Sequence, residues 1–100
     1  MVQVERDVER RLVALVRRAG GWAPKWVSPG TLGVPDRIVF LPGGRVLFVE
    51  VKRPGGRPRP SQEAVHRRLA RLGVPVVVVD DADRFAARYL GCSDGTHGVE

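Results

Sequence analysis

The sequence predicts a small α/β domain: one mixed β-sheet flanked by helices, with elements in the order α-β-β-β-α-β-α. Three patterns support this prediction: an amphipathic helical repeat near the N-terminus, two apolar runs separated by a Pro-Gly-Gly turn, and a second helical repeat followed by a valine-rich run. A strand, a crossover helix and another strand favour a parallel pair with a right-handed connection. One hundred residues are close to the usual size of a single domain, and no internal repeat is visible.

The first helix is expected over residues 4–19, where apolar residues recur at spacings of three and four and arginines fill the intervening positions. Gly20 and Gly21 are a natural end for it. Residues 22–27 predict a short strand, which Pro24 restricts to an edge or a late start. Residues 28–35 are rich in Gly and Pro and predict a loop.

A β-hairpin is expected from residues 37–41 and 45–52, with its turn centred on Gly43. That turn sets the register, so Leu41 should face Arg45 and Val39 should face Leu47. Both strands are apolar on both faces, which is typical of central strands that are covered on both sides.

The remaining elements follow a basic loop at residues 53–60. A second helix is expected over residues 61–72, with Val65, Leu69 and Leu72 facing inward, then a buried strand over residues 74–79. Residues 80–83 should cap a last helix that reaches about Leu90. We therefore expect a domain over residues 1–90 and a disordered tail over residues 91–100, because the tail lacks apolar residues.

The charge balance is strongly basic, with 17 Lys and Arg residues against 11 acidic ones and a net charge of +6. Such a surface is typical of a protein that binds a polyanion, although a generic basic surface is the alternative. Cys92 is the single cysteine, which excludes an intrachain disulfide and a cysteine-based zinc site. No stretch resembles a signal peptide or a membrane span, so a cytoplasmic protein without a membrane partner is expected.

The hairpin register has a chemical consequence at its open end. Asp36 should face Glu50, and Lys52 lies two residues farther along the same face of the strand. Two opposed carboxylates repel each other, and a buried carboxylate needs a partner, so we interpret the cluster as a divalent-cation site. The alternatives are strand-end carboxylates paired with arginines and a Lys52 side chain that extends to solvent.

Oxygen donors of this kind favour Mg²⁺ or Mn²⁺, and the backbone carbonyl of Val51 lies between the two side chains as a possible further ligand. Such an ion polarises a phosphoryl oxygen and lowers the pKa of a water molecule bound to it. Lys52 would orient that water and offset charge on the phosphate.

For four more polar residues, the sequence leaves open whether they belong to this site. Glu9, with Glu5 one turn earlier, either points toward the sheet or makes exposed pairs along the first helix. Gln62 either caps the second helix or reaches the cleft at the strand ends. His66, one turn later, is interpreted as a surface or groove residue rather than a catalytic one.

The motif Pro35-Asp36, followed by Glu50-Val51-Lys52, resembles the PD…ExK signature of the PD-(D/E)XK nuclease superfamily. The surrounding stretch is similar to the VRR-Nuc (virus-type replication-repair nuclease) family, including its compact phage members: GGWAPKWVSPGTLGVPDRIVFLPGGRVLFVEVKRPGGRPRPSQEAVHRRLARLG. The resemblance covers residues 4–90 and implies a PD-(D/E)XK nuclease-like core.

The resemblance also implies a Mg²⁺- or Mn²⁺-dependent DNA endonuclease, expected to act at Holliday junctions or other branched DNA as a homodimer. It implies that Asp36 and Glu50 bind metal, that Lys52 and Gln62 take part in catalysis, and that a glutamate of the first helix completes the site. Glu9 matches that position best, and Glu5 is the alternative.

Several basic residues are expected to contact DNA phosphates: Arg53, Arg57 and Arg59 beside the strand ends, with Arg17, Arg18 and Lys25 extending the track. Trp22, Trp26 or the last helix are candidates for the dimer interface. A non-catalytic DNA-binding module and a nuclease subunit of a larger replication or repair assembly are the alternative functions.

Overall fold

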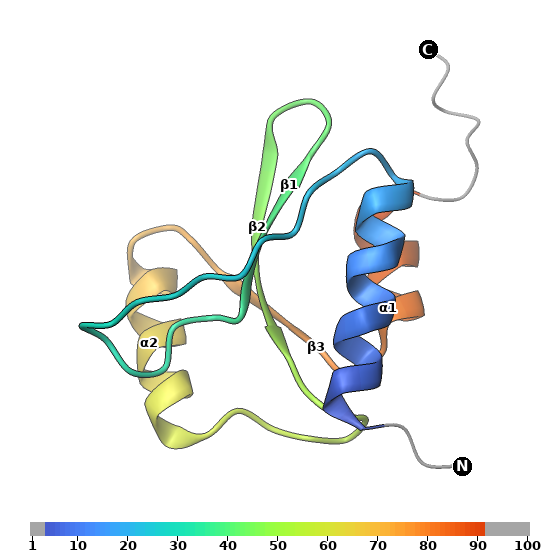
Figure 1. The fold of residues 1–100 in the computed structure, drawn as a ribbon. Coiled ribbons are helices and arrows are strands. Elements are labelled where there is room, and N and C mark those ends of the chain that lie inside the picture. Colours follow the sequence, from blue (N-terminus) through green and yellow to red (C-terminus); the bar gives the residue numbers. More distant parts are fainter. Residues whose placement is uncertain (1–3, 92–100) are drawn as a thin grey trace.

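The computed structural model describes residues 4–91, which form a three-stranded sheet between two helical layers (Figure 1). Helices α1 and α3 lie on one side of the sheet and α2 lies on the other. This arrangement confirms the predicted small mixed α/β fold. In chain order the elements are α1 (Glu5–Arg18), β1 (Arg37–Leu41), β2 (Arg45–Val51), α2 (Pro60–Arg71), β3 (Val76–Val79), α3 (Ala82–Phe85) and a π-helical turn, η1 (Ala86–Leu90).

Strand β2 is the centre of the sheet, antiparallel to β1 and parallel to β3. Leu41 faces Arg45 and Val39 faces Leu47, which confirms the predicted hairpin register. The α2 crossover between β2 and β3 confirms the predicted parallel connection.

The strand expected over residues 22–27 is reduced to two isolated bridges, Trp22 with Phe40 and Lys25 with Arg37. Pro24 lies between them; its carbonyl accepts a hydrogen bond from the Ile38 amide at 3.0 Å. Proline has no amide hydrogen to donate in return, so the ladder cannot continue through it. This segment therefore follows the outer edge of β1 without becoming a fourth strand.

Helix α1 ends where the Gly-Gly pair predicts. Gly20 adopts a left-handed conformation, with φ of +87°. Its amide donates to the Arg17 carbonyl, and the Gly21 amide donates to the Val16 carbonyl, each at 2.9 Å. This is the Schellman arrangement, which satisfies carbonyls at the end of the helix.

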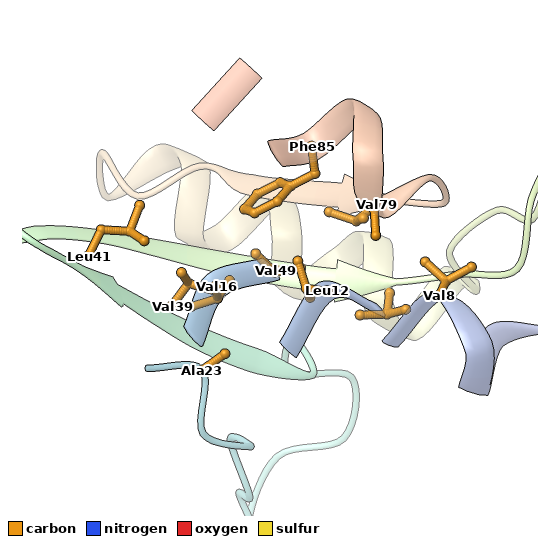
Figure 2. Close-up of a cluster of buried hydrophobic side chains, with 11 residues drawn as sticks. Val8, Leu12, Val16, Ala23, Val39, Leu41, Val49, Val79 and Phe85 are labelled. Atoms are coloured by element: carbon orange, nitrogen blue, oxygen red, sulfur yellow. The ribbon is translucent and has the colours of Figure 1, made fainter. Parts of the chain in front are cut away.

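The hydrophobic core lies on one face of the sheet only (Figure 2). Side chains of α1, including Val8, Leu12 and Val16, meet Val39 of β1 and Val49 of β2 there, and all five are nearly or fully buried. Phe85 of α3 closes the same cluster. Because side chains alternate along a strand, Ile38 and Phe40 of β1 and Val46 and Phe48 of β2 point to the opposite face.

The opposite face is only partly covered, so the expectation that the strands are buried on both sides is wrong near the hairpin tip. Phe40 and Val46, near the tip, are 39% and 46% exposed. Val78 of the outer strand β3, which pairs with Glu50, is 42% exposed as well. Leu72 was expected to face inward from the second helix, but it is 71% exposed just after α2 ends. The α2 helix contacts the sheet near Glu50 instead of the tip.

The C-terminal helix begins as predicted, because the Asp81 carboxylate accepts a hydrogen bond from the Arg84 amide at 3.0 Å. It also ends at the predicted Leu90, although its last five residues are π-helical. Apart from Gly91, the predicted tail lies outside the described residues. Within residues 4–91, no helix is long and apolar enough to cross a membrane.

Candidate active site

Asp36 and Glu50 meet at the end of the hairpin that is farthest from its tip. Burial increases along β2 toward this end, and Glu50 is fully buried. Asp36 directly precedes β1, and its Oδ2 atom accepts a hydrogen bond of 2.7 Å from the Val51 amide. The Asp36 side chain is thereby held against the end of β2, as the strand register predicts.

The two oxygens of Glu50 have different surroundings. Oε2 accepts a hydrogen bond of 2.8 Å from the Gln62 amide nitrogen, and the Lys52 ammonium lies 3.5 Å from the same oxygen. Oε1 is buried and has no hydrogen-bond partner among residues 4–91. His66 Nε2 lies 3.5 Å from this oxygen, and this nitrogen is also buried and without a hydrogen-bond partner within the described part of the chain.

Gln62 has both of the roles that the sequence left open. Its Oε1 atom accepts a hydrogen bond of 2.8 Å from the Arg59 amide and so caps α2. Its Nε2 atom donates to Glu50 at 2.8 Å. One buried side chain therefore fixes the start of α2 and the orientation of the Glu50 carboxylate together.

Gly33 allows the loop that precedes β1 to approach α2. Its φ is +94°, and a Cβ atom at this position would lie 2.5 Å from the Ser61 carbonyl oxygen. Only glycine tolerates both conditions without displacement of the backbone. The loop that leads to Asp36 is thus in contact with the helix that carries Gln62.

Electrostatics of the site reflect two carboxylates in a confined space. Burial, and then the neighbouring Asp36 carboxylate, raise the pKa of Glu50 to about 7, while Lys52 acts in the opposite direction. Burial, and then the Lys52 charge, lower the pKa of His66. Lys52 therefore compensates only in part for the repulsion between the two acids.

These residues fit a hard divalent cation. A buried carboxylate oxygen without a partner faces the site, and a second carboxylate stands beside it. Mg²⁺ is commonly held by one or two carboxylates, with water and substrate phosphate as its other ligands. Residues 4–91 contain no three acidic, histidine or cysteine side chains already clustered to hold a metal, so solvent or substrate would have to complete the shell. The Val51 carbonyl remains a predicted ligand.

Glu9 is not brought to these two acids. Its Oε2 atom accepts a hydrogen bond of 2.9 Å from Arg37 Nε, and Arg37 also donates to the Ala23 carbonyl at 2.6 Å. Arg37 follows Asp36 directly, so the two side chains leave opposite faces of the strand. Glu5, the alternative, is exposed in the first turn of α1. The role of either glutamate in the site remains a prediction.

The basic residues fall into two groups. Arg53, Arg57 and Arg59 are exposed on the loop that leaves the site after Lys52, and the Gly55 amide anchors this loop to Asp80 at 3.0 Å. Lys25 is exposed and bridges to Arg37, next to Asp36.

Arg17 and Arg18 are distant from that loop. They occupy the last turn of α1, which lies near the hairpin tip, whereas the loop passes the first turns of the same helix (Figure 1). Fourteen residues of helix span about 20 Å. A DNA track that includes them would have to follow the length of α1.

His66, interpreted from the sequence as a surface or groove residue, is 15% exposed and lies beside Glu50. It follows Gln62 by four residues, and residues at this spacing share one face of a helix. If Gln62 reaches the cleft, the same spacing places His66 toward it as well.

Comparisons with known proteins agree with this architecture. The family model described as "VRR-NUC domain" matches residues 1–82. The chain is 52% identical over 79 residues to "Putative nuclease p44" of Acyrthosiphon pisum secondary endosymbiont phage 1, covering 79% of this chain and 85% of that protein. A solved structure described as "VRR_NUC domain" superposes with a TM-score of 0.76 at 30% identity, covering 85% of this chain and 95% of the other.

Proposed function

The chain belongs to the VRR-NUC domain family, and on this premise we propose that it is a Mg²⁺- or Mn²⁺-dependent endonuclease that hydrolyses phosphodiester bonds in branched DNA, including Holliday junctions. The observation that carries the proposal is the buried pairing of Glu50 with Asp36, supported by Lys52 and Gln62 on the same side of the sheet. A carboxylate buried at a cost, with one oxygen unsatisfied, is typical of a functional site rather than a structural one.

Each residue has a distinct task in this proposal. Asp36 and Glu50 hold the cation, which supplies charge neutralisation at the phosphate and a lower pKa for the attacking water. Gln62 keeps the Glu50 carboxylate in one orientation through its hydrogen bond to Oε2. The buried Lys52 ammonium, 3.5 Å from Glu50, stabilises negative charge that develops on the phosphate.

The DNA backbone would be held by Arg53, Arg57 and Arg59. These exposed side chains belong to the loop that begins at the end of β2, so they flank the carboxylates. Lys25 lies near Asp36 and would contact phosphates on another side. Contacts of this type position the backbone without reading base sequence, which suits recognition of a DNA structure.

A homodimer is part of the proposal, because two symmetric cuts in a junction require two related sites. The uncovered half of the sheet supports it: Trp22 is 67% exposed and stacks on Phe40, with ring centroids 5.7 Å apart, and Val46, the strand partner of Phe40, lies on the same sheet face. These three residues, the apolar sheet patch, carry no charge and so suit a second copy of a basic chain better than they suit DNA.

The direct test is cleavage of linear, forked, flapped and four-way DNA of matched sequence, with Mg²⁺ and with Mn²⁺. We expect metal-dependent cleavage that favours branched substrates and is lost in Asp36→Asn. Binding without any metal-dependent cleavage would indicate a non-catalytic DNA-binding module instead. Weak cleavage that a partner protein restores would indicate a subunit of a larger replication or repair assembly.

A further inference from the structure

We propose that His66 Nε2 binds the same divalent cation as Glu50 Oε1, which gives the site a mixed nitrogen and oxygen donor set. This inference depends on the proposed metal-dependent function and extends it to a residue outside the PD…ExK signature. His66 lies on the inner side of α2, four residues after Gln62, and its side chain is 15% exposed.

The first argument is that two buried atoms lack partners and face each other. Glu50 Oε1 and His66 Nε2 are the buried side-chain atoms without hydrogen-bond partners among residues 4–91. They lie 3.5 Å apart, which is too long for a good hydrogen bond between nitrogen and oxygen. Unsatisfied buried polar atoms are costly, and here each one points to a missing common partner.

The second argument is the separation itself. Ligand atoms that lie about 2.1 Å from one ion, on neighbouring corners of its coordination shell, are roughly 3.0–3.5 Å from each other. The pair of Glu50 Oε1 and His66 Nε2 meets this condition without movement.

The third argument is that the other donors that approach Glu50 contact its second oxygen. Gln62 and Lys52 both approach Oε2, the other oxygen of Glu50, and Gln62 is held in place by its second bond to the Arg59 amide. Helix α2 therefore presents His66 to Oε1 in a fixed position. An ion at that point would satisfy both atoms, with water and phosphate at other positions. Asp36 would join the shell by a movement of its side chain, because the three groups are not already clustered among residues 4–91.

A nitrogen donor changes the preference of the site among metals. Imidazole binds Mn²⁺, Co²⁺ and Ni²⁺ better than Mg²⁺, which prefers oxygen donors. We therefore expect the protein to bind Mn²⁺ more tightly than Mg²⁺. Replacement of His66 by Gln should reduce the ratio of the two affinities by roughly tenfold.

Pulsed electron paramagnetic resonance of the Mn²⁺-loaded protein without DNA tests the bond directly. A directly bound imidazole produces a ¹⁴N modulation, which should be present in the unaltered protein and absent in His66→Gln. His66 and His97 are the two histidines of the sequence, so His97→Gln is the matched control and should keep the signal. Labelling with ¹⁵N-histidine gives the same test without a substitution, which removes any dependence on how well a variant folds.

Calorimetric titration with Mn²⁺ distinguishes a failure of the His66 inference from a failure of the proposed metal-dependent function. Binding of Mn²⁺ that requires Glu50 but shows no ¹⁴N modulation would overturn the role of His66 and leave the proposed nuclease intact. No binding of Mn²⁺, or binding unaffected by Glu50→Gln, would overturn both. An unchanged preference for Mn²⁺ over Mg²⁺ in a folded His66→Gln would also overturn the inference.

Discussion

At the scale of single residues, Glu50 is placed where its charged form destabilises the fold. Its side chain is fully buried next to a second acid, and burial together with Asp36 raises its pKa to about 7. A shift of this size measures how poorly the metal-free protein accommodates the charged form. A cation would reverse that penalty, since it stabilises the same charge.

The stability of the metal-free protein should therefore depend on pH through Glu50. Between its ordinary pKa of 4.5 and about 7, the folded protein keeps a proton that the unfolded chain has released, so stability falls as pH rises through this window. Glu50→Gln removes the penalty and should stabilise the protein by up to about 3 kcal/mol at pH 8, with little effect at pH 4. Denaturant unfolding with a chelator present measures both values; equal effects at the two pH values would contradict this assignment.

Asp36→Asn should remove the charge beside Glu50 and keep the hydrogen bond that holds the strand ends together. The side-chain oxygen of Asn still accepts the Val51 amide, so the strand ends should stay in place. Loss of the neighbouring charge should lower the pKa of Glu50, which a ¹³C carboxyl titration of the metal-free protein can follow. Metal-dependent cleavage should fall at least about a hundredfold. An unchanged Glu50 titration would show that Asp36 is not its electrostatic partner.

At the scale of elements, the site depends on how α2 is placed against the hairpin. Gln62 links the first turn of α2 to β2, and Gly33 allows the loop before β1 to touch that turn. These contacts come from three separate segments of the chain. A small displacement of α2 would therefore move Gln62 and His66 away from Glu50.

Gly33→Ala should produce this displacement. The new Cβ would meet the Ser61 carbonyl in a backbone conformation that disfavours alanine, at a cost of about 1–3 kcal/mol. Gly30→Ala is the matched control in the same loop, because a Cβ there has no atom within 4 Å. We expect loss of stability and of metal affinity in the first variant only, measured by thermal unfolding and calorimetry. Equal behaviour of the two variants would contradict the packing described here.

At the scale of the whole molecule, one face of the sheet contains the core and the other carries the surfaces that the proposed function uses. The α1 side contains the hydrophobic core, while the α2 side carries the acidic site at one end and the apolar sheet patch at the other. The basic loop flanks the acidic end. If the proposed function holds, this separation should allow DNA binding, catalysis and self-association to be altered independently.

Binding of DNA should weaken steeply with salt, because arginines displace counterions from phosphates. Arg57→Ala should reduce the slope of log K against log salt on duplex DNA by about 0.9, the value for one phosphate contact. Arg88→Ala, another exposed arginine, lies on η1 over the Tyr89 ring and should leave the slope unchanged. Fluorescence anisotropy at several salt concentrations distinguishes them, and a slope insensitive to Arg57 would exclude the loop as a phosphate contact.

Self-association should depend on the apolar sheet patch. Val46→Glu places a charge in the patch and should convert a dimer to a monomer in sedimentation velocity. Val27→Glu is the control, since Val27 is 77% exposed in a loop outside the patch. A monomeric unaltered protein, or dissociation by both variants, would contradict this interface.

The sequence by itself determined the hairpin register and hence the meeting of Asp36, Glu50 and Lys52, because strand pairing follows a local turn and a period of two. It also indicated the helices and their ends, which depend on neighbouring residues. Only the tertiary structure decided that Glu9 pairs with Arg37, that His66 faces Glu50 and that half of one sheet face is uncovered. These depend on the rotation and position of helices against the sheet, which are set by packing between distant segments and have no local periodic signal.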